Sequence, residues 1–286
     1  MEWAGESKNM KVLRAAILAA AAVLVLLPLV YTVSNAFMGS SELLHYYGSL
    51  WSGERRYMNF HLIPDRWSLE GLYRVFLADA NYLTKFWNSL GMTAAIVTGQ
   101  VLLSLTAGYG FSRFRFPGRN VLFVAVIILM MMPYQVTLVS NYIVLDHMGL
   151  LGSYAAMILP GIFSSFGVFL IKQTVDEIPT ETLEAAKLDG AGVFRTMIYI
   201  VAPICRGGIV SLILLNFVDN WNMVEQPIVF LKEERMYPLS VFLARSLSDT
   251  KSAGFACGLL ALAPVMLLYM NFKEELMNGI AVSSLK

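Results

Sequence analysis

The most regular feature of the chain is the alternation of long apolar stretches with shorter polar ones. A helix needs roughly 20 mostly apolar residues to cross the hydrocarbon core of a bilayer. Six stretches meet or nearly meet this length, and each predicts a transmembrane helix. They are residues 12–33, 88–109, 121–145, 154–171, 204–229 and 255–272.

Helix-breaking residues recur inside these stretches. Every stretch except 88–109 contains a proline, and 88–109 contains glycines instead. A backbone hydrogen bond that is broken in lipid has to be replaced by a neighbouring helix or by water in a cavity. The pattern therefore favours a transporter, whose helices pack together and move, over a simple anchor. The prolines are Pro28, Pro133, Pro160, Pro227 and Pro264.

Composition supports a membrane location. The chain is 57% hydrophobic and 14% charged, far from the composition of an ordinary soluble domain. Lys8, Lys11 and Arg14 precede the first stretch, as in a signal peptide, but this stretch is longer than a typical signal-peptide core and lacks a good cleavage site. We therefore predict a retained first span, in an all-α membrane protein that forms a single transmembrane domain over residues 1–286.

The distribution of lysine and arginine predicts the orientation. Short cytoplasmic loops carry an excess of these residues. With the N-terminus inside, Arg113, Arg115 and Arg119 share one short inner loop, and the short outer loop 146–153 has no lysine or arginine. Six spans then place both termini in the cytoplasm. The long inner loop covers about residues 176–203, and the long outer loops cover about 38–87 and 232–254.

Several classes of function are disfavoured. The net charge is +1 without a basic stripe, so nucleic acid is not a predicted partner. The chain has no G-x-x-x-x-G-K-[ST] loop to hold the phosphates of ATP. Cys205 and Cys257 lack disulfide or metal-site spacing and are predicted to be small buried side chains. His45, His61 and His147 lack partner spacing, so no metal site is predicted.

The first outer loop is rich in aromatic residues. They fit either a belt at the membrane interface or a docking surface for a partner, and the sequence favours neither reading. The residues are Tyr46, Tyr47, Trp51, Tyr57, Trp67, Tyr73 and Phe76.

The long inner loop predicts two short helices at an angle. The run 180–189 is rich in helix formers, and Gly190 supplies a stop or a sharp bend. Small residues at Ala185 and Ala186 permit close approach, so the exposed bend suits a groove on another protein. The alternative is an amphipathic hairpin on the membrane surface. The second helix is predicted to carry an apolar stripe of Phe194, Met197, Ile198 and Val201, and a solvated helix start is predicted at Asp176, Glu177 and Glu181.

Polar residues cluster in two of the spans. Such residues are costly in lipid and tend to face the bundle interior or an aqueous path. Amide, carboxylate and aromatic groups together suit the binding of a sugar, and the same groups also suit a hydrogen-bond network between subunits. The fifth span holds Asn216, Asp219, Asn220, Trp221, Asn222 and Gln226, and the third holds Tyr134, Gln135 and Asn141.

The inner loop contains a spaced motif. Glu184-Ala185-Ala186 is followed at fixed distances by Gly190, Ile200 and Pro203. The motif resembles the EAA loop of ABC importer permeases, with Ala202 where that family usually has leucine. The resemblance implies a type I importer architecture and a loop that engages cytoplasmic ATPase subunits. The coupling residues that it implies are Glu184, Ala185, Ala186, Asp189, Gly190, Ile200 and Pro203.

Other segments resemble carbohydrate-uptake permeases of the maltose type, and in particular the shorter of their two permeases. The segment 223–226 departs from the usual sequence and leaves the substrate open. The similar segments are "FWNSL", "AGYGFSRFRFPGRN", "MMPYQV", "GLLGSYAAMILP", "WNMVEQPIVFL", "MYPLSV" and "NGIAVSSLK".

The resemblance implies a non-catalytic subunit of a bacterial or archaeal cell membrane. Its partners would be a second homologous permease, two ATPase subunits that use ATP and Mg²⁺, an extracellular solute-binding protein and a sugar. The chain itself would bind no cofactor. The runner-up is an ion-coupled secondary transporter with Asp219 as its coupling carboxylate, but the internal repeats typical of that class are not evident. A membrane enzyme is a third option, disfavoured because no nucleophile–base pair lies near a span.

Overall fold

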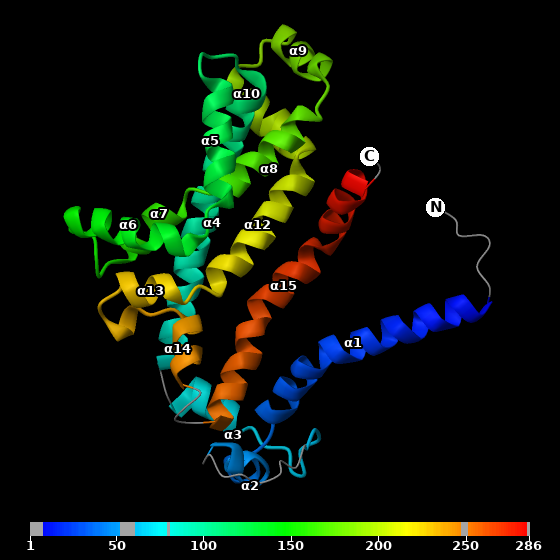
Figure 1. Ribbon diagram of the computed structural model, residues 1–286, viewed down its shortest axis with the longest axis vertical. Coiled ribbons are helices and arrows are strands. Elements are labelled where there is room, and N and C mark those ends of the chain that lie inside the picture. The colour runs from blue at the N-terminus through cyan, green and yellow to red at the C-terminus, as the bar shows by residue number, and fades with distance from the viewer. Residues whose placement is uncertain (1–7, 52–60, 79–80, 247–250, 285–286) are drawn as a thin grey trace. The chain divides into compact units, whose positions relative to one another are not determined.

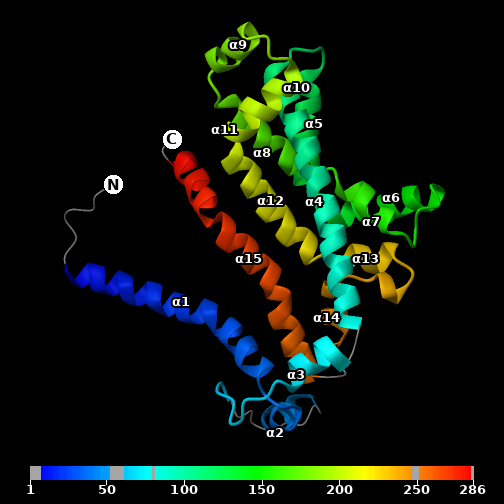
Figure 2. The ribbon, with the colours of Figure 1, turned by 180° about the vertical axis from the view of Figure 1, so that it is seen from behind.

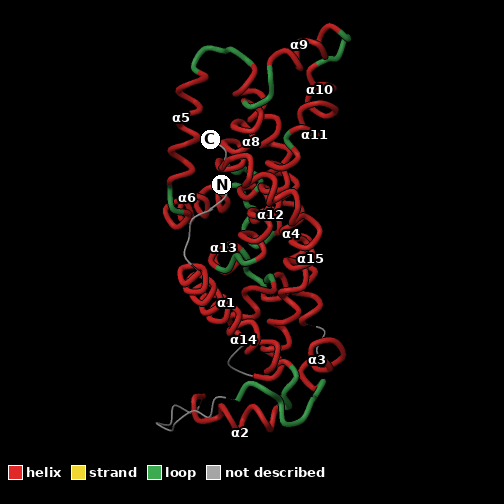
Figure 3. The backbone as a smooth tube through the Cα atoms, turned by 90° about the vertical axis from the view of Figure 1, so that its right-hand side faces the viewer, coloured by secondary structure: helices red, strands yellow, loops and turns green. Residues whose placement is uncertain are grey.

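A computed structural model describes residues 8–51, 61–78, 81–246 and 251–284 (Figure 1). Within these ranges the chain consists of helices and loops, without a β-strand (Figure 3). The all-α fold class is confirmed. The α-helices are α1 Lys8–Ala36, α2 Ser40–Trp51, α3 Glu70–Tyr73, α4 Asn81–Arg113, α5 Arg119–Met131, α6 Tyr134–His147, α7 Tyr154–Gly161, α8 Ser165–Asp176, α9 Thr180–Leu188, α10 Val193–Thr196, α11 Ala202–Ile204, α12 Arg206–Trp221, α13 Glu225–Phe230, α14 Leu239–Ser246 and α15 Lys251–Ser284. Arg74–Ala78 (η1) and Met197–Val201 (η2) are π-helical turns, and Glu234–Met236 (η3) is a 3₁₀ turn.

The described helices provide up to six membrane spans. Four segments are long and apolar enough to cross a bilayer alone: Asn9–Ala36, Asn81–Arg113, Tyr154–Asp176 and Ala253–Glu275. Two further pairs pass the same test only when each bent pair is taken together, namely α5 with α6 and the segment Val193–Ile204 with α12. The predicted number of six spans agrees with this upper value.

The bent pairs differ from the continuous helices that the stretches 121–145 and 204–229 suggest. α5 and α6 meet at 105° because Pro133 has no N–H and favours an extended backbone at Met132. The segment before α12 meets it at 79° beside Cys205. α12 ends at Trp221, and α13 is a separate short helix, so the stretch 204–229 is not one helix.

One compact unit consists of residues 1–83 and 245–262. Met38, Leu43 and Tyr47 form its core. The ring of Tyr31 contacts Tyr47 and Phe255 edge-on, with centroid distances of 5.8 and 5.7 Å. These aromatic contacts join α1, α2 and the first turns of α15 within this unit.

The aromatic residues of the first outer loop divide between the interior and the surface of this unit. Tyr47 is fully buried, whereas Trp67 and Tyr73 are 74% and 60% exposed. The side chain of Trp51 and the whole of Tyr57 lie outside the described residues. Part of the aromatic content is therefore core, which neither sequence-based reading anticipated.

The second unit consists of residues 84–244 and 263–286. α4 approaches α7 and α8 closely through small residues, as is common between membrane helices. A Cβ atom at Gly108 would lie 2.9 Å from the backbone nitrogen of Lys172, and one at Gly167 would lie 2.2 Å from Ser104 Oγ. α8 also packs against α5 and α12 (Figure 2). The main core contains Leu105, Tyr109, Ile171, Val175, Ile178, Met197, Val201, Cys205 and Leu212.

Both cysteines fit their predicted role. Cys205 lies in the core of the second unit, and Cys257 is buried in the first. Neither cysteine forms a disulfide. They are small buried side chains, as predicted.

Candidate coupling site and substrate pathway

α9 is the exposed helix of the predicted inner loop, and it lies near the ends of α4 and α5 in Figures 1 and 2. Glu184, Ala185 and Asp189 are exposed, whereas Ala186 is buried. The motif therefore presents an acidic side chain and a small side chain on the outward face of the helix. This face can be approached closely by another protein.

A glycine cap ends α9. Gly190 has φ of +77°, in the left-handed region that favours glycine. Its N–H donates to the carbonyl of Lys187 at 3.1 Å, and the N–H of Ala191 donates to Ala186 at 3.0 Å. These are the two bonds of a Schellman cap. The bend predicted at Gly190 is confirmed, and Gly192, with φ of −71°, is the residue before α10.

The helix after the bend is less regular than predicted. It consists of α10, the π-helical turn η2 and α11. A π-helical turn shifts the helical register, so Met197 and Val201 are buried while Phe194 and Ile198 are 73% and 54% exposed. The predicted stripe of four apolar residues on one face is therefore wrong. Of the motif residues in this segment, Ile200 is half-buried and Pro203 is exposed.

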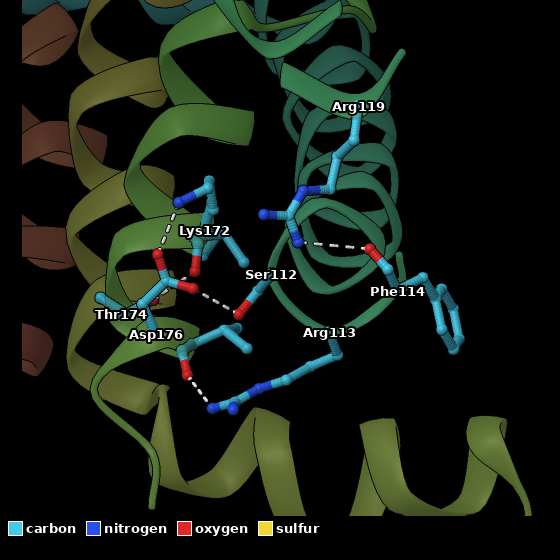
Figure 4. A network of polar contacts seen from close by, with 9 residues as sticks. Ser112, Arg113, Phe114, Arg119, Lys172, Thr174 and Asp176 are labelled. Atoms are coloured by element: carbon cyan, nitrogen blue, oxygen red, sulfur yellow. Dashed lines mark hydrogen bonds and ion pairs between the residues drawn. The ribbon is translucent and has the colours of Figure 1, made fainter. Parts of the chain in front are cut away.

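Arg113 links the end of α4 to the segment just before α9. Its guanidinium donates to the carbonyls of Val175 at 2.5 Å and Ile178 at 2.7 Å. Figure 4 shows Arg113 near Ser112 and Asp176. The last carbonyls of a helix have no partner within the helix, and a cation is favourable at that end. Arg113 thus caps α8 and fixes the chain just before α9.

Asp176 adds a second tie between the same two helices. Ser112 Oγ and Lys172 Nζ each donate to its carboxylate at 2.5 Å (Figure 4). The ammonium of Lys172 also lies 4.7 Å from the ring centre of Phe123 in α5. The predicted solvated helix start is wrong for Asp176, which is the last residue of α8 and is held by two donors.

A hollow of about 450 Å³ separates α9 from the end of α4. Its walls include Tyr109 of α4 and Phe114 just after it, and Leu183 and Lys187 of α9. Helix α9 is therefore held firmly at its base but is not packed along its whole length. Such an element can shift as a unit when a partner binds.

The polar residues of the fifth span do not share one environment. Asn216 is buried, and Asn220 donates to its carbonyl at 2.7 Å. Trp221 is buried with its ring 5.5 Å from that of Phe217. Asp219 is exposed on the same helix. Past the end of α12, Asn222 is exposed and Gln226 is half-buried.

The third-span candidates lie on α6, beyond the bend at Pro133. Tyr134 and Asn141 are half-buried, and Gln135 is exposed. The side-chain amide of Gln135 donates to Glu225 of α13 at 3.3 Å. The structure therefore brings the beginning of α6 next to the beginning of α13. Of the fifth-span candidates, Asn222 lies just before α13 in the chain and Gln226 lies within its first turn.

A buried polar stripe on α4 escaped the sequence reasoning. The residues are spaced by four or seven positions, which places them on one face of a helix. Ser89 accepts the N–H of Leu239 at 2.7 Å, and Gln100 donates to the carbonyl of Gly161 at 2.8 Å. The regular spacing of polar residues in an apolar stretch was the signal. The stripe is Lys85, Ser89, Thr93, Gln100 and Ser104.

Residues 100–274 match the inner membrane components of binding-protein-dependent transport systems. The chain belongs to this family. It is therefore a multi-pass membrane protein and a transport subunit rather than a catalyst, and the ABC permease reading is confirmed.

Curated relatives match this permease over most of its length. The arabinooligosaccharide transport permease AraQ of Bacillus subtilis is 28% identical, covering 92% of this chain and 91% of AraQ. The sn-glycerol-3-phosphate transport permease UgpE of Brucella abortus is 26% identical, with coverage of 90% and 91%. The lactose transport permease LacG of Rhizobium radiobacter is 27% identical, with coverage of 71% and 76%.

Solved structures show the same fold. A chain from a bacterial ABC transporter involved in import of the acidic polysaccharide alginate superimposes with a TM-score of 0.82 at 18% identity, over 96% of this permease and 99% of that chain. A second structure, of an alginate transporter with its periplasmic protein bound to an alginate pentasaccharide, gives a TM-score of 0.60 at 14% identity, with coverage of 93% and 96%. The importer permease architecture is thus confirmed.

Proposed function

We propose that this permease forms half of the transmembrane pathway for a sugar or oligosaccharide in an ATP-driven importer. The other half is a second homologous permease. Two cytoplasmic ATPase subunits use ATP and Mg²⁺, and a solute-binding protein delivers the substrate outside a bacterial or archaeal cell. Both termini of the permease lie in the cytoplasm, and the permease itself binds no cofactor.

The names of the relatives support a sugar or a related polyol phosphate as the substrate of this permease. Two relatives carry saccharides in their names, and the similar solved transporters import a polysaccharide. A sugar offers many hydroxyl groups, which amide and carboxylate side chains can bind. The exposed polar residues Asp219 and Asn222 are the best candidates for such contacts, because a polar group facing lipid is costly.

The coupling role is carried by one observation: α9 is exposed along its Glu184 face while its base is fixed. Arg113 joins α4 to the end of α8, directly before α9. A push on α9 by an ATPase subunit would therefore reach α4 and α8 together. These two helices are in close contact through Gly108 and Gly167, so they would move as one body.

The outer end of α4 supports a role for the second outer loop in substrate delivery. Lys85 donates to the carbonyl of Glu234, and Asn88 donates to the carbonyl of Arg235 at 2.7 Å. The loop 232–238 is therefore held in one conformation on α4. A fixed loop loses less conformational entropy when a binding protein docks on it.

The coupling role is tested by Glu184→Lys in the full complex. The permease should still insert into the membrane, but co-purification of ATPase subunits should weaken by about tenfold or more, because the change reverses a charge that the proposed interface would bury. Glu274→Lys, an exposed charge reversal on α15, is the matched control. Unchanged ATPase recovery and transport in the Glu184 variant would remove that residue from the coupling role.

A further inference from the structure

Three potential metal ligands meet in the first compact unit. Glu42 of α2, His61 and Asp65 each place one ligand atom so that all three atoms lie within 4.8 Å of one another. No local pattern predicts this cluster, because Glu42 lies 19 positions before His61 in the chain. The cluster lies outside the membrane spans and takes no part in the coupling contacts around Arg113.

The imidazole of His61 is the most informative member. Its Nε2 atom is shielded from solvent and makes no hydrogen bond of normal geometry. It nevertheless lies 3.2 Å from Asp65 Oδ1. Two ligands bound to one tetrahedral Zn²⁺ at about 2.0–2.1 Å are separated by roughly 3.3 Å. The distance therefore suits two ligands of a shared ion.

Surrounding side chains fix the three ligands. The ring of Tyr46 stacks on His61 with a centroid distance of 4.2 Å, and its hydroxyl donates to Asp65 Oδ2 at 2.6 Å. The backbone N–H of Asp65 donates to Glu42 Oε1 at 2.7 Å. One oxygen of each carboxylate is thus engaged and the other is left for an ion. Such outer contacts orient ligands in protein metal sites.

The charge of the cluster favours a cation. Two carboxylates and a neutral imidazole together carry two negative charges. Histidine nitrogen with carboxylate oxygen is a ligand set of Zn²⁺ and similar divalent ions.

We propose that Glu42, His61 and Asp65 bind a divalent transition-metal ion of the Zn²⁺ type, which ties the segment 61–65 to α2. Water completes the coordination, as at other three-ligand zinc sites. The proposal concerns the first unit alone and does not depend on the transported substrate or on ATPase coupling.

The experiment is metal binding to the purified full-length permease in its complex. Zn²⁺ should bind at one site per permease, and Co²⁺ in its place should give the visible spectrum of a tetrahedral site. His61→Ala should weaken Zn²⁺ binding by at least about tenfold. Tyr46→Phe should weaken it less, because this change removes an orienting contact but no ligand. Thermal unfolding of each variant without metal checks that it folds.

His147→Ala is the matched control, because His147 is exposed at the end of α6 and belongs to the other unit. It should bind Zn²⁺ like the wild type. Equal loss in the His61 and His147 variants, or no loss in either, would place the bound ion elsewhere and overturn the proposal. Absence of stoichiometric Zn²⁺ binding by the wild type would reduce the cluster to an ion pair between His61 and Asp65.

Discussion

Gly190 shows how one backbone angle sets the position of the coupling helix. A Cβ atom at this position would meet open space, so the side chain of a substitute causes no clash. The φ of +77° is nevertheless unfavourable for any other common residue, and most of all for a β-branched one. The cost of replacing Gly190 is therefore confined to the backbone and its cap.

Gly190→Val should destabilise the bend by about 1–2 kcal/mol and misdirect α9. We expect ATP hydrolysis to continue while substrate transport falls, measured together in proteoliposomes. Gly192→Val is the control, because Gly192 has an ordinary φ and no neighbour within 4 Å of its Cβ position. Normal coupling in the Gly190 variant would show that α9 tolerates a different cap.

At the scale of helices, close contact between α4 and α8 is the feature that makes them one body. The Cβ position of Gly108 meets the backbone of Lys172, which cannot move aside as a flexible side chain can. Gly110 is on the same helix, but its Cβ position has no neighbour within 4 Å. Comparing the same substitution at the two glycines therefore separates the effect of close packing on stability from the effect of helix propensity.

Gly108→Val should lower stability by about 1–3 kcal/mol, because overpacking forces the helices apart. Gly110→Val should have a much smaller effect. Thermal unfolding of the two variants in detergent measures the difference. Equal loss of stability would mean that the α4–α8 contact adjusts easily and does not transmit motion as a rigid joint.

Exposed and buried polar residues on and just after α12 should differ in how readily a reagent in water reaches them. Cysteine at Asp219 or Asn222 should react with a small polar thiol reagent, and the rate should change between the nucleotide-free and ATP-bound complexes. Cysteine at Asn216 should stay unreactive, because that position is buried. Unreactive cysteines at both exposed positions in every state would assign this surface to the interface with the second permease.

Local sequence patterns predicted most elements but not how they meet. The length of the apolar stretches was enough to indicate the spans. The bend was predicted because glycine at position 190 favours the left-handed backbone that ends a helix. The bend at Met132 could have been anticipated from Pro133, but its angle depends on tertiary packing. Arg113 and the carbonyls that it caps are 62 and 65 residues apart in the chain, so no local pattern reveals them. Trp221 was predicted to line the pathway, but the structure buries it beside the rings of Phe86 and Phe217. A tryptophan side chain suits either position, so the sequence alone could not distinguish them.

At the scale of the whole molecule, the source of energy separates the two transport mechanisms considered from the sequence. In an ATP-driven importer, Asp219→Asn should retain uptake, with altered affinity at most, and dissipating the ion gradients with an ionophore should leave it unchanged. Uptake into proteoliposomes with enclosed ATP measures both effects. Loss of uptake in both tests would identify Asp219 as an ion-coupling carboxylate.

The contact between Arg113 and the end of α8 would also transmit a change from α4 and α8 to α9. If displacement of α9 changes the arrangement of α4 and α8, then any substrate that prefers one arrangement must change the affinity of the ATPase subunits for α9 by the same factor. Binding of substrate and binding of the ATPase subunits would therefore each affect the other through this contact. A permease loaded with substrate would hold its ATPase subunits differently from an empty one, before any nucleotide is hydrolysed.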